Sequence, residues 1–207
     1  MEMLALALQI AFLGLAFGLR TYLHARKTGS PGFRLGARRT RAEAIGAGGI
    51  AVAAAGSLIV TILALTSTLG SIRVLDYIWL QWFGATIAGL GLIIVLAAQS
   101  NMGRSWRIGV DQSETTDLVT GGIFSLIRNP IFLGMLLFWV GMALLAPNAL
   151  SIASFAIALI SIEVQVRLVE EPYLTRTHGD TYLAYASRTG RLLPGIGRLR
   201  GVRTVSP

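Results

Sequence analysis

The stretch that decides the fold covers residues 131–162 and reads IFLGMLLFWVGMALLAPNALSIASFAIALISI. It has no charged residue and is 32 residues long, whereas one helix needs only about 20 apolar residues to cross a bilayer. Pro147 and Asn148 divide it near the middle, and such a pair between apolar runs is typical of a turn. The stretch therefore predicts two membrane helices joined as a tight hairpin, extending over about residues 130–166.

Three more segments are almost free of charge, at residues 3–19, 45–72 and 78–99. Apolar residues make up 54% of the chain and charged residues only 14%, against about 25% charged in soluble domains. The mean hydropathy is +0.66. These values exclude an ordinary soluble domain and predict an all-α, polytopic membrane protein with about five transmembrane helices.

The basic residues show how such a chain would be oriented. With five spans, 17 of the 18 Lys and Arg residues fall on one side of the membrane, and Arg73 alone falls on the other. By the positive-inside rule we expect a multi-pass protein of the cell membrane, with its N-terminus outside and its C-terminus in the cytoplasm. The first span has Glu2 before it and its basic cluster after it, so it is interpreted as an uncleaved anchor rather than a signal peptide.

Several classes of function are disfavoured. The chain has no cysteine and two histidines, so no metal site is expected. Its positive charge is explained by topology and by attraction to anionic lipid headgroups, so nucleic acid is not an expected partner. The spans lack central ionisable residues, which disfavours ion-coupled transport. Small-residue pairs at Gly14 and Gly18 and at Ala85 and Gly89 are interpreted as packing sites within a monomer or weak homo-oligomer.

The chemistry is expected in two cytoplasmic segments. Residues 1–99 are interpreted as three membrane helices with a basic cytoplasmic loop at 24–44, and residues 100–207 as the functional core. Within the core, Asn129 and Pro130 suit the N-cap and first turn of a helix. Downstream, Glu163, Arg167 and Glu170 share one helical face, and Pro172 predicts a kink or a restart of the helix.

Two motifs carry a resemblance. The first comprises Leu118-Val119-Thr120, a glycine, an aromatic residue and then RNPIFLG at residues 128–134. The second comprises, in order, Arg167, Glu170, Glu171, His178, Gly179, Tyr182, Tyr185, Arg188, Arg191 and Pro194. Together they resemble the isoprenylcysteine carboxyl methyltransferase and phospholipid methyltransferase families, over roughly residues 100–195. Asn129 stands where many members have His, and Phe124 and Phe132 stand where Tyr is usual.

The resemblance implies a methyltransferase that binds S-adenosyl-L-methionine without a Rossmann domain. Its cofactor pocket is formed by the cytoplasmic loop, the ends of the last spans and the C-terminal helices, and a lipophilic acceptor enters from the inner leaflet. The cofactor would be bound by Leu118, Val119, Phe124, Arg128, Asn129, Pro130, Phe132, Glu170 and Glu171. Arg128 would contact either the cofactor carboxylate or a lipid phosphate. Arg167 and Glu170 would be the catalytic residues, and Arg167, Tyr182 and Tyr185 would contact the acceptor.

The acceptor is left open between a prenylcysteine-like or other isoprenoid carboxylate, another lipid and a thiol. A carboxylate or thiolate needs no general base, whereas an amine or hydroxyl would need Glu163, Glu170 or Glu171. Two other functions are also considered. One is an NADPH-dependent membrane reductase of the sterol type, although no glycine-rich dinucleotide motif is recognisable. The other is a non-catalytic membrane scaffold in which Arg167 and Glu170 merely pair.

Overall fold

The structure is a computed structural model, and it describes residues 1–31, 40–66, 68–106 and 117–199. Residues 32–39 of the predicted basic loop 24–44 therefore lie outside the described residues. The described part is almost entirely helical, as predicted. An isolated bridge between Ile127 and Gly190 is its only β pairing among these residues.

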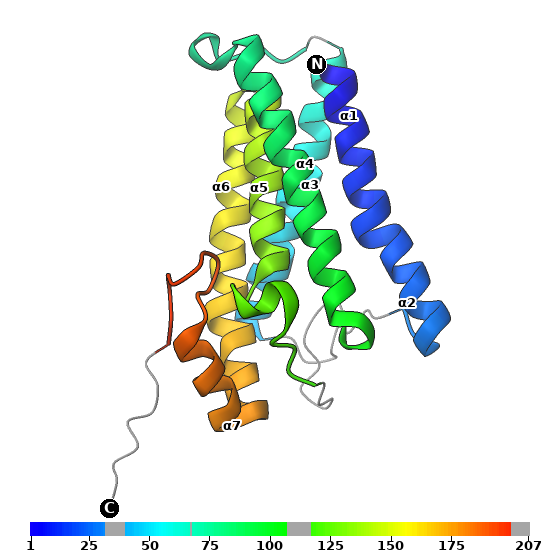
Figure 1. The fold of residues 1–207 in the computed structure, drawn as a ribbon. Coiled ribbons are helices and arrows are strands. Elements are labelled where there is room, and N and C mark those ends of the chain that lie inside the picture. Colours follow the sequence, from blue (N-terminus) through cyan, green and yellow to red (C-terminus); the bar gives the residue numbers. More distant parts are fainter. Residues whose placement is uncertain (32–39, 67, 107–116, 200–207) are drawn as a thin grey trace, which may run out of the picture.

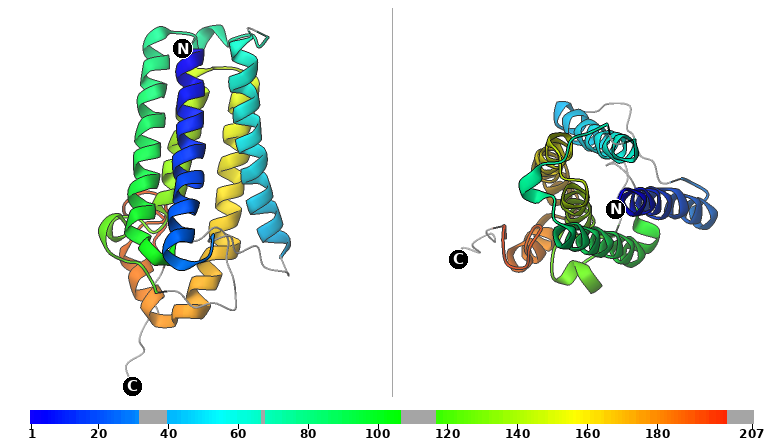
Figure 2. Two further views of the ribbon diagram at one scale, coloured as in Figure 1. Left: turned by 90° about the vertical axis from the view of Figure 1, so that its right-hand side faces the viewer. Right: turned by 90° about the horizontal axis from the view of Figure 1, so that it is seen from above.

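Five rods form an elongated bundle, with the N-terminus at one end and the last helix, which ends at Arg188, at the other (Figures 1 and 2). The first rod is continuous through α1 (Glu2–Ala11), the π-helical η1 (Phe12–Leu19) and α2 (Arg20–Thr28), and the others are α3 (Arg41–Leu65), α4 (Ile78–Met102), α5 (Pro130–Leu145) and α6 (Ala149–Val164). Four rods are long and apolar enough to span a membrane, and α5 is a shorter apolar helix of 16 residues. The prediction of about five membrane helices is confirmed.

Local sequence explains where the rods begin and end. Gly29 ends α2 in a left-handed conformation with φ of 76°, which glycine adopts without strain. Thr40 and Glu43 form a capping box that starts α3, so two backbone N–H groups gain partners.

The predicted hairpin turn is confirmed. The Asn148 side chain accepts hydrogen bonds from the backbone N–H groups of Leu150 and Ser151, each at 3.0 Å, and so caps α6. The carbonyl of Pro147 accepts the N–H of Ile72 at 2.7 Å. The turn is thereby tied to the segment before the 3-10 turn η2 (Arg73–Leu75) at the same end of the bundle.

Glycine brings α4 and α5 into direct backbone contact. A β-carbon added at Gly91 would lie 2.5 Å from the carbonyl oxygen of Gly134, and one added at Gly141 would lie 2.4 Å from that of Gly84. The interpretation of Gly14 and Gly18 as internal packing sites was wrong: a β-carbon at Gly14 would meet nothing within 4 Å, and one at Gly18 only its own helix at 3.8 Å. Gly89 also has nothing within 4 Å, because it faces away from α5.

The last rod continues past the hairpin. After α6 come the π-helical η5 (Gln165–Glu170) and then α7 (Glu171–Arg188). The α-helix resumes next to Pro172, which lies in its first turn as expected, but the chain breaks helical geometry later, at Gly179 with φ of 51° and ψ of −131°. The helical stretch Ala149–Arg188 has 40 residues but is interrupted at Gly179, so it is not one straight rod. Since about 20 apolar residues are enough to cross a bilayer, its second half is not needed for the span.

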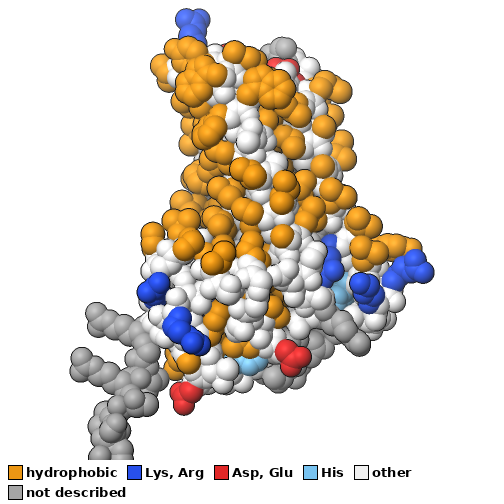
Figure 3. Space-filling view, viewed as in Figure 1, with side chains coloured by type: hydrophobic (Ala, Val, Ile, Leu, Met, Phe, Trp, Pro, Cys, Tyr) orange, Lys and Arg blue, Asp and Glu red, His pale blue; other side chains and the backbone are white. Residues whose placement is uncertain are grey.

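The surface agrees with this placement. Hydrophobic side chains cover the length of the rods, and most visible charged side chains gather at the end that carries α7 (Figure 3). Ile10, Val52, Ile93 and Ile160 are among the large apolar residues exposed on four different rods. Such a surface requires lipid around it.

Candidate functional site

Two adjoining cavities lie where the bundle meets η5, α7 and the loop before α5. The polar cavity has a volume of about 150 Å³ and the apolar cavity one of about 280 Å³. They share five wall residues, Met102, Phe124, Arg128, Asn129 and Glu170. The polar cavity is completed by Ser105, Asp117, Leu118, Val119, Tyr173, Leu174, Tyr182 and Tyr185. The apolar cavity is completed by Phe17, Ala47, Ile50, Val95, Gln99, Trp106, Pro130, Ile131, Phe132, Met135 and Gln165.

The wall between the cavities is built by pairing two distant segments. The 3-10 turn η4 (Gly122–Ser125) leads into residues 127–129, which lie beside residues 190–191. The N–H of Arg128 donates to the carbonyl of Gly190 at 2.8 Å, and that of Asn129 to the carbonyl of Arg191 at 3.0 Å. The Tyr185 hydroxyl donates to the carbonyl of Phe124 at 2.6 Å. The C-terminal segment thus fixes the loop that forms the wall.

Arg128 is bound by its own chain. Its guanidinium donates to the carbonyls of Ala186, Thr189 and Gly197 and to the carboxylate of Glu171. The Arg128 side chain is only 2% exposed. These bonds occupy its two terminal nitrogens, whereas its Nε has no hydrogen-bond partner among the described residues, and Arg128 lines both cavities. The predicted contact of Arg128 with a cofactor carboxylate or a lipid phosphate stays a prediction.

Glu171 is also engaged within the protein. Its Oε1 accepts from Arg128 at 2.8 Å and from Arg191 Nε at 2.8 Å, and its Oε2 accepts from Arg191 Nη2 at 2.9 Å. The hydrogen bond with Glu171 raises the pKa of Arg191 above its usual value, and the charge of Glu171 adds to this effect. We call these three residues, Arg128, Glu171 and Arg191, the clamp. Both carboxylate oxygens of Glu171 accept hydrogen bonds within the clamp, and Glu171 lines neither cavity. Its expected contact with the cofactor therefore stays a prediction.

The neighbouring carboxylates have a different position. Glu170 lines both cavities, and Asp117 lines the polar cavity. Tyr173 stands three residues after Glu170, on the same side of the helix, and is 4% exposed. The structure thus places two acidic groups and several aromatic rings around one space, a combination that suits a cationic ligand.

The other predicted cofactor residues lie at the cavities. Leu118, Val119 and Phe124 line the polar cavity, and Pro130 and Phe132 line the apolar one. Pro130 occupies the first turn of α5 as expected, whereas the Asn129 side chain does not cap it. Its Nδ2 instead donates to the carbonyl of Arg191 at 3.3 Å, so the backbone pairing with residues 190–191 replaces the predicted cap.

Of the three residues predicted to contact the acceptor, two line a cavity and one does not. Tyr182 and Tyr185 line the polar cavity, away from the apolar one. Arg167 lines neither cavity; its side chain is 58% exposed and pairs with Glu163 one turn earlier. The structure therefore does not place Arg167 at either cavity, and its predicted contact with the acceptor stays a prediction. On the helix that carries it, Arg167 lies on the exposed side, whereas Val166 and Val169 are buried.

Some wall residues were missed by sequence reasoning. Trp106 is 2% exposed, with the His24 ring at 5.3 Å and the Arg20 guanidinium at 5.1 Å from its ring centre. Gln99 and Gln165 also line the apolar cavity. They lie within apolar spans and carry no charge, so the charge pattern of the sequence did not indicate them. A polar amide in an otherwise apolar span was the available signal.

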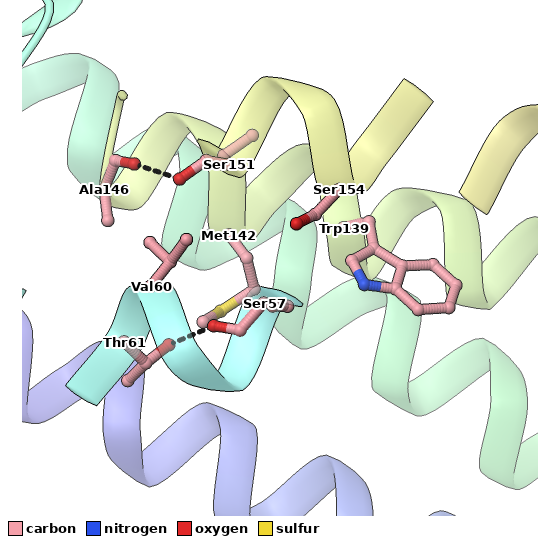
Figure 4. Close-up of a pocket in the computed structure, with 9 residues that line it drawn as sticks. Ser57, Val60, Thr61, Trp139, Met142, Ala146, Ser151 and Ser154 are labelled. Carbon is pink, nitrogen blue, oxygen red and sulfur yellow. Dashed lines mark hydrogen bonds between the residues drawn. The ribbon is translucent and has the colours of Figure 1, made fainter. Parts of the chain in front are cut away.

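A third cavity lies near the opposite end of the bundle, among Ser57, Thr61, Ser151 and Ser154 (Figure 4). It is lined by four hydroxyl side chains, by Trp139, which carries an indole N–H, and by apolar side chains, and its volume of about 10 Å³ is enough for one water molecule. The Ser151 hydroxyl donates to the carbonyl of Ala146 at 2.6 Å, and that of Thr61 to the carbonyl of Ser57 at 3.0 Å. This cavity is too small for a substrate.

Comparison with known proteins identifies related chains. The phospholipid methyltransferase family profile matches residues 79–181. Protein-S-isoprenylcysteine O-methyltransferase B of Arabidopsis thaliana is 31% identical over 120 residues, which cover 57% of this chain and 61% of the relative. The corresponding enzyme of Dictyostelium discoideum is 30% identical over 119 residues, covering 56% of this chain and 50% of the relative.

A solved structure shows the same fold. It is that of the eukaryotic intramembrane Ras methyltransferase, isoprenylcysteine carboxyl methyltransferase, with a TM-score of 0.58 and 21% identity, over 95% of this chain and 78% of the other. The first two curated relatives, both from Arabidopsis thaliana, are matched over about three fifths of their length. The family profile, over residues 79–181, covers nearly all of α4 and the whole of α5 and α6, and it includes the five residues that the two cavities share. Residues 190–191 lie outside it.

Proposed function

We propose that this chain, which is similar to phospholipid methyltransferases over residues 79–181 and to isoprenylcysteine O-methyltransferases, is an S-adenosyl-L-methionine-dependent membrane methyltransferase. Its acceptor is a lipophilic carboxylate of the prenylcysteine type. The observation that carries the proposal is the junction of a polar and an apolar cavity at Phe124, Asn129 and Glu170. Two chemically different reactants can therefore meet at one place.

The polar cavity fits the cofactor by its chemistry. A sulfonium and an ammonium group need negative charge and aromatic faces nearby, and Asp117, Glu170 and Tyr173 provide them. Leu118 and Val119 offer apolar walls for the adenine ring. When bound, S-adenosyl-L-methionine supplies an electrophilic methyl group on its sulfonium sulfur.

The apolar cavity fits the acceptor. It lies among α3, α4, α5 and the two π-helical segments, and most of its lining is apolar. A hydrocarbon chain there would be shielded from water by Ile50, Val95 and Met135. Exclusion of water strengthens the nucleophilicity of a carboxylate, so the residues at the junction need only align the reactants at about 3 to 3.5 Å. No general base is required for this acceptor.

The placement in the cell follows from the charge distribution. Among the described residues, the basic residues of α2, the start of α3 and α7 lie at the end of the bundle that carries the two cavities. We assign this end to the cytoplasmic side of the cell membrane, so the acceptor enters from the inner leaflet. The N-terminus then lies outside and the C-terminus in the cytoplasm.

The test is ligand-dependent stability in nanodiscs followed by a methylation assay. A ligand at 100 times its dissociation constant stabilises by about 2.7 kcal/mol, which raises the melting temperature by a few degrees. S-adenosylmethionine and S-adenosylhomocysteine are expected to give this shift and NADPH none, and N-acetyl-S-farnesylcysteine is expected to accept a labelled methyl group. A shift with NADPH alone would contradict the proposal in favour of a reductase. A scaffold would respond to none of the three and methylate nothing.

A further inference from the structure

Residues 190–197, which we call the C-terminal turn, follow α7 and expose apolar side chains. The segment turns back from α7 toward the rods (Figures 1 and 2) and pairs with the loop before α5. The N–H of Arg191 donates to the carbonyl of Ile196 at 2.7 Å, and that of Ile196 to the carbonyl of Leu193 at 3.1 Å. Leu192 packs against the hydrophobic core of the bundle, whereas Leu193 is 48% and Ile196 64% exposed.

The C-terminal turn lies level with the edge of the bilayer core. Aromatic side chains are exposed at the start of α4, Trp79 among them at 65%, and such residues mark a membrane interface. A hydrocarbon core of about 30 Å takes about 20 residues of helix to cross, so α4 leaves it near Gln99. A β-carbon added at Gly134 would lie 3.0 Å from the backbone nitrogen of Val95. The antiparallel α5 begins one turn before Gly134, and therefore beside Gln99, with the C-terminal turn next to it.

The charges around the C-terminal turn suit the lipid headgroups found at this depth. Residues 181–207 contain five arginines and no acidic residue. Arg191 is held in the clamp, whereas Arg188 and Arg198 are exposed. The guanidinium of Arg198 lies over the turn, since a β-carbon added at Gly195 would be 3.5 Å from its Nη2. Basic side chains beside exposed apolar ones are typical of segments that lie in a membrane interface and bind anionic lipids.

The apolar surface is also continuous with the surface that faces lipid. Leu126 belongs to the loop that pairs with the C-terminal turn, and it is 62% exposed. Water around Leu126, Leu193 and Ile196 would leave this apolar surface unburied at the end of an already apolar bundle. Lipid covers it with the same acyl chains that surround the rods.

We infer that the C-terminal turn is a membrane anchor, which inserts Leu193 and Ile196 into the leaflet on the α7 side and places Arg188 and Arg198 at its anionic headgroups. Since Arg191 belongs to both the turn and the clamp, the anchor also supports the wall between the two cavities. The inference concerns an interaction surface and does not depend on methyl transfer. Only the identification of this leaflet as the inner one rests on the proposed orientation.

The experiment measures the depth of single spin labels. The chain has no cysteine, so Leu193→Cys and Ile196→Cys can each carry one nitroxide in nanodiscs that contain phosphatidylglycerol. Electron paramagnetic resonance compares the access of oxygen, which concentrates in lipid, with that of a water-soluble nickel chelate. Both labels are expected about 5–10 Å below the membrane surface. Asp180→Cys, exposed on α7, is the control in water, and Ile160→Cys, 64% exposed on α6, is the control in lipid.

The role of the arginines is tested with the Ile196 label. Arg188→Gln together with Arg198→Gln should make this label shallower, and nanodiscs of phosphatidylcholine alone should have the same effect. Arg176→Gln, at an exposed arginine of α7 outside the turn, should leave the depth unchanged. A depth that ignores both the arginines and the lipid charge would overturn their assignment to headgroups.

Two results would overturn the anchor itself. Labels at Leu193 and Ile196 that the nickel chelate reaches as readily as the label at Asp180 would place the turn in water. Labels shielded from both oxygen and the chelate would mean that protein, such as a second copy of this chain, covers the turn. The labelled positions are exposed, so the substitutions leave the core intact, and neither result bears on the proposed methyl transfer.

Discussion

Glu170 and Glu171 are adjacent in the sequence but have different surroundings. Glu171 is held by Arg128 and Arg191 and is removed from both cavities, whereas Glu170 lines both. A helix turns by about 100° per residue, so neighbouring side chains point in different directions. At the scale of single residues, this rotation decides which of the two carboxylates lines the cavities.

We therefore expect Glu170→Gln to weaken cofactor binding. Removal of one negative charge beside a sulfonium should lower the affinity for S-adenosylmethionine by about tenfold, since charge-assisted contacts contribute about 1.5–3 kcal/mol. Titration of the thermal shift in nanodiscs measures this. Glu163→Gln is the matched control on the same helix, because the Glu163 carboxylate pairs with the exposed Arg167 and lines neither cavity. The affinity of this variant for S-adenosylmethionine should stay unchanged. Equal losses in both variants would refute the assignment.

The sequence allowed part of this site to be predicted. The family resemblance implied that Leu118, Val119, Phe124 and Glu170 lie at the pocket, and the structure puts all four on the wall of the polar cavity. The sequence pattern did not predict that the terminal nitrogens of Arg128 donate to four acceptors within the protein. Those acceptors belong to residues 171–197, far away in the sequence. Contacts over such separations depend on how the C-terminal segment packs.

At the scale of elements, the clamp joins the start of α7 to the segment after it and to the loop before α5. Arg128 and Glu171 are 43 residues apart, and Glu171 and Arg191 are 20 apart. The clamp side chains are 2%, 10% and 14% exposed for Arg128, Glu171 and Arg191, respectively. Breaking a buried pair leaves an unpaired charge, which is far more costly than removing an exposed pair.

Glu171→Gln is expected to destabilise the protein by roughly 3 kcal/mol, because it removes the charge that compensates two arginines. The melting temperature in nanodiscs should fall by several degrees, and protease cleavage near residues 189–199 should become faster. Arg191→Met should lower the melting temperature less, since Arg128 still neutralises the carboxylate. Unchanged melting in Glu171→Gln would show that the clamp contributes little.

The contact between α4 and α5 offers a second test of an element. Gly91→Leu should destabilise by at least about 2 kcal/mol, because its β-carbon would lie 2.5 Å from the Gly134 carbonyl oxygen and the helices would have to separate. Gly89→Leu, two residues earlier, has open space around it and should be nearly neutral. Thermal melts of the two variants measure the difference. Equal stability would mean that the helices do not approach as closely as the structure shows.

At the scale of the whole molecule, the charge asymmetry sets the orientation. Only Arg73 among the Lys and Arg residues falls on the side assigned to the outside. Because the chain has no cysteine, single cysteines can report topology without interference. Val74→Cys, at a residue 75% exposed, should react with a membrane-impermeant maleimide in intact cells. Asp180→Cys should react only after permeabilisation, and the reverse pattern would invert the proposed topology.

The sequence by itself determined the architecture of this protein. Apolar runs of sufficient length, the Pro147–Asn148 turn and the skewed basic residues required a helical bundle in a membrane, since lipid leaves few alternatives for the backbone. The tertiary structure alone decided which small residues touch, which of two adjacent glutamates faces the cavities, and that Arg167 points away. These outcomes depend on helix rotation and on pairing between distant segments, and a one-dimensional pattern of apolar and charged residues specifies neither.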